Sequence, residues 1–311
     1  MPRRKTPVES KLSGHDAAPR PRFKSRRPQC AFQGELGAFS HEAIRRFLGD
    51  EVQPFPCQRF EQVFAALAGR KVDAAVIPIE NTLHGSVHEN YDHLLQFDTR
   101  ILAETSVRIV HNLMAAPGVS FRNVRRVYSH PVALNQCLQF FVQHPRVEKE
   151  PFYDTAGSVK MIMEGRPGDA AAIASSVAAD IYGAHILKRS IEDDRQNFTR
   201  FFLLERGGTK ARKTRPAAAA SISAPGAWKT SLVFTTRNSP GALFRALSAF
   251  ALRDVSLAKI ESRPLRGKPW EYLFYLDFLG HVEEPRVKNA LGHLRELADF
   301  LRVLGTYPRG D

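Results

Sequence analysis

Short apolar runs alternate with amphipathic helical patterns along the first two thirds of the chain. Between Gln29 and Glu205, each predicted strand is followed by a segment with helical periodicity. The strand and helix pairs cover 30–32 with 40–48, 52–55 with 60–69, 74–79 with 86–97, 125–129 with 131–143, 151–153 with 155–165, and 171–174 with 175–183. Strands that alternate with single helices predict an α/β fold in which helices cover parallel sheets.

One apolar stretch, 101–116, is too long for a single simple strand. We interpret it as a crossover between two sheets, and we expect the chain to return to the first sheet at a predicted strand, 198–205. The region 29–206 is thus predicted to form two α/β lobes, 29–105 with 187–206 and 106–186, arranged as in periplasmic binding proteins. Open sheets bind ligands at the carboxyl ends of their strands, so a cleft between the lobes is the expected site.

The pattern changes in the last third of the chain. Six predicted elements follow in the order βαββαβ, at 230–236, 240–253, 255–264, 270–280, 285–300 and 301–307. This order predicts a ferredoxin-like domain over 229–308. Such modules are usually regulatory or pairing units, although a fold alone does not establish a function.

The net charge of +13 is concentrated in two segments. Residues 1–29 hold nine Lys and Arg against two acids, and residues 207–228 hold four against none, so the remainder carries only +2. Both segments offer little to bury, and we expect a disordered basic head, 1–28, and a disordered linker, 207–228. Because the folded parts are nearly neutral, no nucleic-acid partner is expected.

Cysteine usage and hydropathy indicate the compartment. Cys30, Cys57 and Cys137 are odd in number, far apart and without a CxxC pair. Reduced thiols of this kind predict a cytoplasmic protein. No apolar run approaches the roughly 20 residues that a membrane helix needs, so no membrane partner is expected.

Five predicted helices of the first region begin at a small hydroxyl residue. Each could simply be an N-cap, and Glu89 would complete a capping box with the second of them. Together they would place several positive helix ends around one cleft, which favours a small substrate with more than one carboxylate. The five residues are Ser40, Ser86, Ser129, Thr155 and Ser175.

Polar side chains follow the buried strand 74–79. Glu80, Asn81 and Thr82 should lie at its carboxyl end, where the cleft is expected. The amide of Asn81 could bind a hydroxyl or carboxylate, or it could only form a turn. Gln136 lies one or two turns into the next lobe's first helix, where an exposed glutamine would be ordinary.

Two familiar ligand-binding motifs do not fit the sequence. Gly34 and Gly37 are spaced GxxG, which matches neither the dinucleotide fingerprint nor a Walker loop. The segment HENYDH, His88 to His93, is one residue longer than HExxH, so its histidines would lie about 140° apart on a helix. Neither a nucleotide nor a metal ion is predicted.

Thr199 and Arg200 stand side by side at the start of the strand 198–205. Alternation places Thr199 with Phe201 on one face and Arg200 with Phe202 on the other. The strand could simply enter from solvent, with Arg200 paired to an acid just before it. The candidates for that pair are Glu192, Asp193 and Asp194. Alternatively, Thr199 and Arg200 contact an anionic substrate.

Several motifs in sequence resemble the prephenate dehydratase family. They are GELGAFSHEA, IPIENTLHGSV, YSHPVALNQC, DTAGSV, AAIAS and NFTRFFLL. The segment 240–264, PGALFRALSAFALRDVSLAKIESRP, resembles the ACT regulatory domain attached to it. The resemblance covers roughly Cys30 to Tyr307.

The resemblance implies a decarboxylating dehydration of prephenate to phenylpyruvate, without cofactor or metal. It makes Thr199 the acid or hydrogen-bond donor to the departing hydroxyl, with Arg200 orienting the strand or a carboxylate. Asn81 and Gln136 would hold the substrate. The other substrate-binding candidates are Glu80, Ser86, Ser129, Thr155, Ser175 and Phe201.

The resemblance also implies feedback regulation by L-phenylalanine and a homodimer or homotetramer. The expected effector site comprises Asn238, Gly241, Ala242, Leu243, Glu261, Ser262, Arg263 and Pro264. Without the family, Pro240 would only open a helix and Pro264 only end a strand. Two other functions remain open: an arogenate dehydratase, and a two-lobed ligand sensor that performs no reaction.

Overall fold

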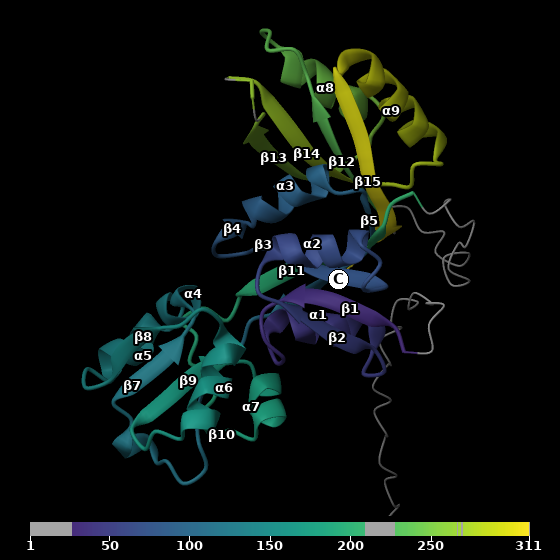
Figure 1. The fold of residues 1–311 in the computed structure, drawn as a ribbon. Coiled ribbons are helices and arrows are strands. Elements are labelled where there is room, and N and C mark those ends of the chain that lie inside the picture. The colour runs from purple at the N-terminus through teal and green to yellow at the C-terminus, as the bar shows by residue number, and fades with distance from the viewer. Residues whose placement is uncertain (1–26, 209–227, 266, 269, 311) are drawn as a thin grey trace, which may run out of the picture.

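The chain folds into three parts that follow one another along a bent molecule (Figure 1). The computed structural model describes residues 27–208, 228–265, 267–268 and 270–310. Most of the expected disordered head and linker, 1–26 and 209–227, lies outside the described residues. In the described part, no helix has both the length and the apolar character needed to span a membrane.

The first lobe is built on a six-stranded sheet with the order β2-β1-β3-β11-β5, and β4 pairs with β3. Strands β1, β2 and β3 are parallel, whereas β11 runs antiparallel to both β3 and β5. The elements are β1 (Gln29–Gln33), α1 (Phe39–Leu48), β2 (Gln53–Cys57), α2 (Phe60–Ala68), β3 (Ala74–Asn81), β4 (Gly85–Ser86), α3 (His88–Gln96), β5 (Thr99–Arg108) and β11 (Phe198–Arg206).

The second lobe has a five-stranded sheet with the order β10-β6-β9-β7-β8. Strands β7, β8 and β9 are parallel, and β6 and β10 are antiparallel additions. The elements are β6 (Asn112–Ala115), η1 (Phe121–Asn123), β7 (Arg126–Ser129), α4 (Pro131–Asn135), α5 (Leu138–Gln143), β8 (Glu148–Pro151), α6 (Thr155–Gly165), β9 (Ala170–Ala174), α7 (Ser176–Tyr182) and β10 (His185–Lys188).

The chain crosses between the lobes slightly later than the sequence pattern indicated. The stretch expected to be a crossover contains β5 and β6, one in each sheet. Strand β5 stays paired with β11 up to Arg108, three residues beyond the expected boundary. On the return, β10 keeps Lys188 in the second sheet. Pairing partners, which a single sequence does not reveal, set these limits.

The C-terminal domain has the βαββαβ order and the ferredoxin-like sheet order β13-β14-β12-β15, so this expectation is confirmed. All its strand pairs are antiparallel. Helices α8 and α9 cover one face of the sheet, and the other face packs on the first lobe (Figure 1). The elements are β12 (Trp228–Thr235), α8 (Ala242–Ala251), β13 (Leu257–Pro264), β14 (Tyr272–Leu279), α9 (Pro285–Leu297) and β15 (Phe300–Pro308).

Most of the expected hydroxyl caps are wrong. Ser175 caps α7 by accepting a hydrogen bond from the Ala178 backbone N–H at 3.2 Å. The cap of α6 is Asp154, whose carboxylate accepts from the Gly157 N–H at 2.7 Å, because an ionised acceptor forms the stronger bond. The remaining hydroxyl residues lie inside a strand or the first helical turn: Ser40, Ser86, Ser129 and Thr155.

The two lobes meet tightly at the loop after β1. The Ser175 hydroxyl donates to the Gly37 carbonyl oxygen at 2.6 Å, and the Tyr153 hydroxyl donates to Glu35 at 2.9 Å. Gly37 has φ of 91°, and a Cβ there would lie 2.6 Å from the Cα of Ala178. A glycine is therefore required both for the backbone conformation and for the approach of the lobes.

We expect Gly37→Ala to destabilise the protein more than Gly118→Ala does. Gly118 has a similar φ of 88°, but a Cβ there would meet nothing within 4 Å. Both variants carry the cost of a positive φ, and only Gly37→Ala adds the clash between the lobes. Urea unfolding should show an extra loss of roughly 1–3 kcal/mol. Equal losses for the two variants would mean that the lobes do not need this approach.

Candidate active site

Thr199 and Asn81 face each other where strand β11 begins and strand β3 ends. They are paired in the sheet register. The Asn81 side-chain amide donates to the Thr199 hydroxyl at 3.0 Å and to the Asn197 side-chain oxygen at 2.8 Å. The Phe198 carbonyl oxygen also lies 3.1 Å from this amide nitrogen. One asparagine thus organises the start of β11.

The orientation of the Asn81 amide is fixed by its other end. Its Oδ1 accepts from the backbone N–H groups of Leu83 and His84, each at 3.0 Å. The nitrogen must therefore face Thr199, and the Thr199 hydroxyl acts as the acceptor of that bond. No acceptor for the Thr199 hydroxyl hydrogen occurs among the described residues, so this hydrogen is available to a ligand.

A second amide, that of Gln136, bridges the lobes beside this pair. Gln136 lies at the C-cap of α4 and is buried. Its Nε2 is 3.1 Å from Nδ1 of His84 in the first lobe, and its Oε1 is 2.7 Å from Nε2 of His111 in the crossover. We call Thr199, Asn81, Asn197, His84, Gln136 and His111 the interlobe cluster.

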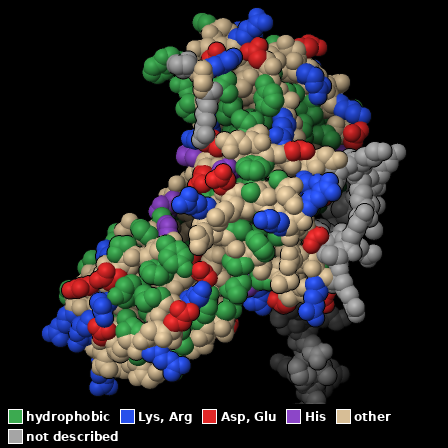
Figure 2. All heavy atoms as spheres, in the orientation of Figure 1, with side chains coloured by type: hydrophobic (Ala, Val, Ile, Leu, Met, Phe, Trp, Pro, Cys, Tyr) green, Lys and Arg blue, Asp and Glu red, His purple; other side chains and the backbone are tan. Residues whose placement is uncertain are grey.

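The protonation of the interlobe cluster follows from burial. His111 is 1% exposed, and burial lowers the pKa of its ring, so the ring is neutral at pH 7. Its Nε2–H donates to the Gln136 oxygen, and the Gln136 NH₂ group then donates to Nδ1 of His84. Nδ1 of His84 is the acceptor of that bond. The side chain of His84 is exposed. Figure 2 shows exposed histidines (purple) between the second lobe, at the bottom of the view, and the C-terminal domain, at the top.

Three members of the interlobe cluster were missed in the sequence. Asn197 lies two residues before Thr199, so the strand period could have placed it on the same face. It is fully buried, and its Nδ2 has no partner among the described residues. His84 belongs to the segment that contains Asn81, and its exposed loop position was the available signal. His111 carries no local signal, because only the fold brings it to Gln136.

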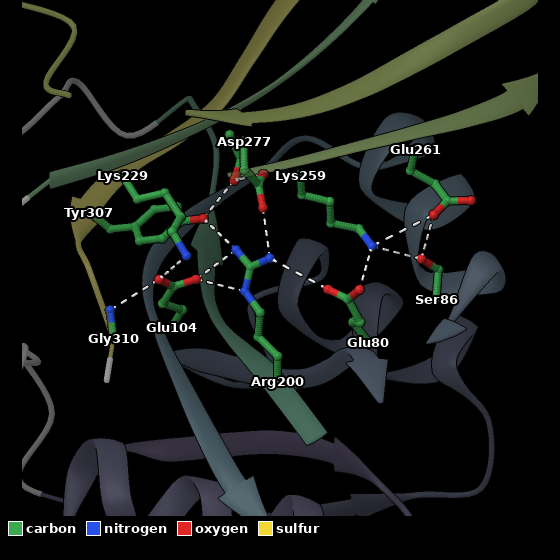
Figure 3. Close-up of polar contacts among 11 residues, drawn as sticks. Glu80, Ser86, Glu104, Arg200, Lys229, Lys259, Glu261, Asp277, Tyr307 and Gly310 are labelled. Atoms are coloured by element: carbon green, nitrogen blue, oxygen red, sulfur yellow. Dashed lines mark hydrogen bonds and ion pairs between the residues drawn. The ribbon is translucent and has the colours of Figure 1, made fainter. Parts of the chain in front are cut away.

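Arg200 points away from the interlobe cluster, towards the C-terminal domain (Figure 3). Its guanidinium lies 2.6 Å from Glu104 of β5 and 2.7 Å from Asp277 of β14. Its contact with the Phe202 ring confirms that these two side chains share a face of β11. Burial lowers the pKa of Arg200, but Asp277, Tyr307 and Glu104 more than offset this, and the pKa is raised. Arg200 is charged and lies between the first lobe and the C-terminal domain, on the face of β11 opposite Thr199.

The expected pairing of Arg200 with an acid just before the strand is wrong. Glu192 accepts from the His111 backbone N–H at 3.0 Å. Asp193 accepts from two backbone N–H groups at the start of α5, and Asp194 from that of Gln196. These acids therefore bond to backbone N–H groups, and Arg200, although close to them in the sequence, points to the opposite side of β11.

Glu80 and Ser86 also contact the C-terminal domain (Figure 3). Lys259 of β13 donates to Glu80 at 2.8 Å and to the Ser86 hydroxyl at 3.0 Å. Ser86 in turn donates to Glu261 at 2.6 Å. The side chains of neighbouring residues in β3 thus diverge, because Asn81 faces the interlobe cluster and Glu80 faces the opposite side.

The other substrate-binding candidates are enclosed. The Ser129 hydroxyl is buried and donates to the Ile173 carbonyl oxygen at 2.6 Å. Phe201 is part of the core between the lobes. Thr155 is half-buried in the first turn of α6, whose end already holds the Asp154 carboxylate. Fewer helix N-termini are therefore free to bind a substrate carboxylate than the sequence indicated, because the protein's own acceptors already bond to some of them.

The expected effector residues lie in two segments of the C-terminal domain. Gly241 has φ of 75° and precedes α8, which begins with Ala242 and Leu243. The second segment ends β13, and there Glu261 contacts Ser86 while Arg263 lies 3.1 Å from Asp92 of α3. Ser262 and Pro264 alternate with them and are exposed. The Asn238 side chain donates to the Trp270 carbonyl oxygen at 3.2 Å.

Two family models together match nearly the whole described chain. A family model described as "Prephenate dehydratase" matches residues 30–209, and one described as "ACT domain" matches residues 230–296. The first covers both lobes, and the second covers most of the C-terminal domain.

Individual proteins match over similar lengths. The chain is 42% identical to arogenate dehydratase/prephenate dehydratase 2, chloroplastic, of Arabidopsis thaliana over 91% of this chain and 73% of that protein. A prephenate dehydratase from Arthrobacter aurescens in complex with L-Phe superposes with a TM-score of 0.79 at 31% identity, over 90% of each chain. A structure described as GqqA, a quorum quenching acylase, gives a TM-score of 0.79 at 33% identity, over 90% of this chain and 97% of that one.

We expect the buried His111 to make the protein less stable in acid. Its folded pKa is below the ordinary value of 6.5, so unfolding takes up a proton below that pH and becomes more favourable. Melting temperatures between about pH 7.5 and 5.5 should fall less for His111→Gln than for the parent. The lowered pKa values of His41 and His130 affect both proteins alike. Parallel falls would show that His111 is not held neutral.

Proposed function

Since this chain belongs to the prephenate dehydratase family, we propose that it converts prephenate to phenylpyruvate, water and carbon dioxide. The family's dehydratase activity makes the protein a lyase. In this reaction the bond to the ring carboxylate breaks and its electron pair enters the ring. The bond to the ring hydroxyl breaks as the ring becomes aromatic, and the hydroxyl leaves as water after it gains one proton.

The observation that carries this proposal is the free hydrogen of the Thr199 hydroxyl. Asn81 donates to the Thr199 oxygen, so the hydroxyl hydrogen remains for donation to a ligand. A leaving hydroxyl placed there receives that hydrogen bond as negative charge develops on its oxygen. The amide of Gln136 supplies a further donor from the second lobe, across the gap from Thr199.

A threonine hydroxyl is a weak acid, and its contribution is one of position. General acid catalysis contributes roughly 10²- to 10⁴-fold, and a donor with a high pKa acts by hydrogen bonding and by relaying a proton from solvent. Aromatisation of the ring supplies most of the driving force. The chain's own task is therefore to hold the departing oxygen against Thr199.

Arogenate is a second candidate substrate, favoured by the names of similar plant proteins. Arogenate dehydratase 2 of Petunia hybrida is 41% identical to this chain over 91% of its length. Arogenate differs from prephenate in an ammonium group where prephenate has a keto group, and its elimination gives phenylalanine. Incubation of the purified chain with each substrate, followed by detection of phenylpyruvate or phenylalanine, separates the two. No product from either would support a ligand sensor instead.

Regulation by L-phenylalanine is proposed for the C-terminal domain. The ACT match and the L-Phe complex of the Arthrobacter aurescens protein support it.

We also propose a homodimer or homotetramer, since exposed apolar side chains such as Phe244 and Leu252 on α8 could pack against a second copy. Cys30, Cys57 and Cys137 are buried free thiols, which supports a reducing compartment. The cytoplasm is our proposal, whereas the Arabidopsis relative is named chloroplastic.

We expect Thr199→Ala to lower kcat by roughly 10²- to 10⁴-fold while the protein stays folded. Thr199→Ser is the matched control, because it retains the hydroxyl that Asn81 orients, and it should keep most of the activity. Steady-state kinetics and a thermal melt of both variants make the comparison. Near-normal turnover by Thr199→Ala would remove Thr199 from the mechanism.

A further inference from the structure

Strand β11 connects the interlobe cluster to the C-terminal domain through adjacent residues. Thr199 bonds to Asn81 on one side, and Arg200 reaches Asp277 on the other. The two side chains are attached to neighbouring Cα atoms, so a shift of the Arg200 backbone moves Thr199 with it. A displacement of about 1 Å in a reacting group can lower a rate about 10²-fold.

The pairing of this part of β11 with β3 is irregular. Arg200 pairs with Glu80, but the next residue, Phe201, pairs with Pro78, so Ile79 is an extra residue in β3. The Ile79 carbonyl oxygen accepts instead from the Val87 backbone N–H at 2.9 Å. A bulge of this kind interrupts the ladder and lets a strand re-aim its side chains. On its other edge, β11 pairs with β5 without interruption from Phe198 to Leu203, so contacts beyond the sheet adjust the position of Thr199 on the β3 side.

Asp277 is well placed to supply such a contact. It is buried, and the Ser231 hydroxyl donates to its Oδ1 at 2.6 Å, which leaves Oδ2 to face Arg200 at 2.7 Å. Glu104, the other close carboxylate, is shared with Lys229 at 2.6 Å. Among the described residues, Asp277 is the one carboxylate of the C-terminal domain that lies against Arg200.

We propose that Asp277 is a positioning residue for the dehydration, acting from the C-terminal domain through Arg200 to set the place of Thr199. The proposal rests on the proposed role of Thr199. It gives the C-terminal domain a part in basal turnover, separate from any effector. Because the contact orients a donor that acts on the departing oxygen, its loss lowers kcat more than it changes KM.

The central experiment compares Asp277→Asn with Asp92→Asn in the full-length protein. Asp92 pairs with Arg263 at 3.1 Å across the same two domains, on α3 rather than on β11. We expect Asp277→Asn to lower kcat at least about tenfold with KM changed less than about threefold. Asp92→Asn should stay within about twofold of the parent in both constants. Normal kcat in Asp277→Asn, or equal losses in both variants, would overturn the proposal.

A double variant keeps the test decisive if Asp277→Asn is poorly folded, since it leaves no unpaired arginine. Arg200→Gln combined with Asp277→Asn should have the same kcat as Arg200→Gln alone, because both act through one contact. Losses that multiply would contradict this. Thr199→Ala is measured in the same assay. An active Thr199→Ala overturns both the role of Thr199 and this proposal, whereas an inactive one with normal Asp277→Asn overturns this proposal alone.

Discussion

The pleat of strand β11 is the constraint on which the rest of the structure depends. Successive side chains of a strand point to opposite faces, so Thr199 and Arg200 cannot serve the same site. The first meets Asn81 at the gap between the lobes, and the second enters a buried set of charges under the C-terminal sheet. The interlobe cluster and the charged residues around Arg200 are thereby connected through two adjacent residues of one strand.

On the interlobe side, the direction of the hydrogen bond between Asn81 and Thr199 is set by groups that can only donate. Backbone N–H groups can only donate, so they fix the oxygen of Asn81 and turn its nitrogen towards Thr199. The side-chain oxygen of Gln136 lies 2.7 Å from Nε2 of the buried His111 ring, so that ring donates to it from Nε2. The Gln136 amide, from the second lobe, bonds in turn to His84 of the first lobe. The relative position of the lobes thus determines whether this chain of bonds is complete.

The sequence predicted the layers of the fold but only part of the site. Alternating strands and helices were enough for two α/β lobes and a βαββαβ domain, because apolar period and loop length are local properties. The face of β11 that carries Arg200 and Phe202 was also predictable from the period of two. The partners of Arg200 were not, since Glu104 and Asp277 lie 96 and 77 residues away in the chain. Ser86 and Ser129 failed as caps because they lie within strands, Ser40 because it lies inside α1, and Thr155 because Asp154 caps α6.

The place of β11 in the sheet has a consequence for how the chain is made. It lies between β3 and β5 but is synthesised after the entire second lobe. Until residues 198–206 leave the ribosome, β3 and β5 each present an open edge of unpaired backbone groups. The ion pairs of Glu104 with Lys229 and of Arg200 with Asp277 of β14 form only after the C-terminal domain is synthesised. The sheet of the first lobe is therefore started first but completed late. While β11 is missing, the open edges of β3 and β5 can pair with wrong strands.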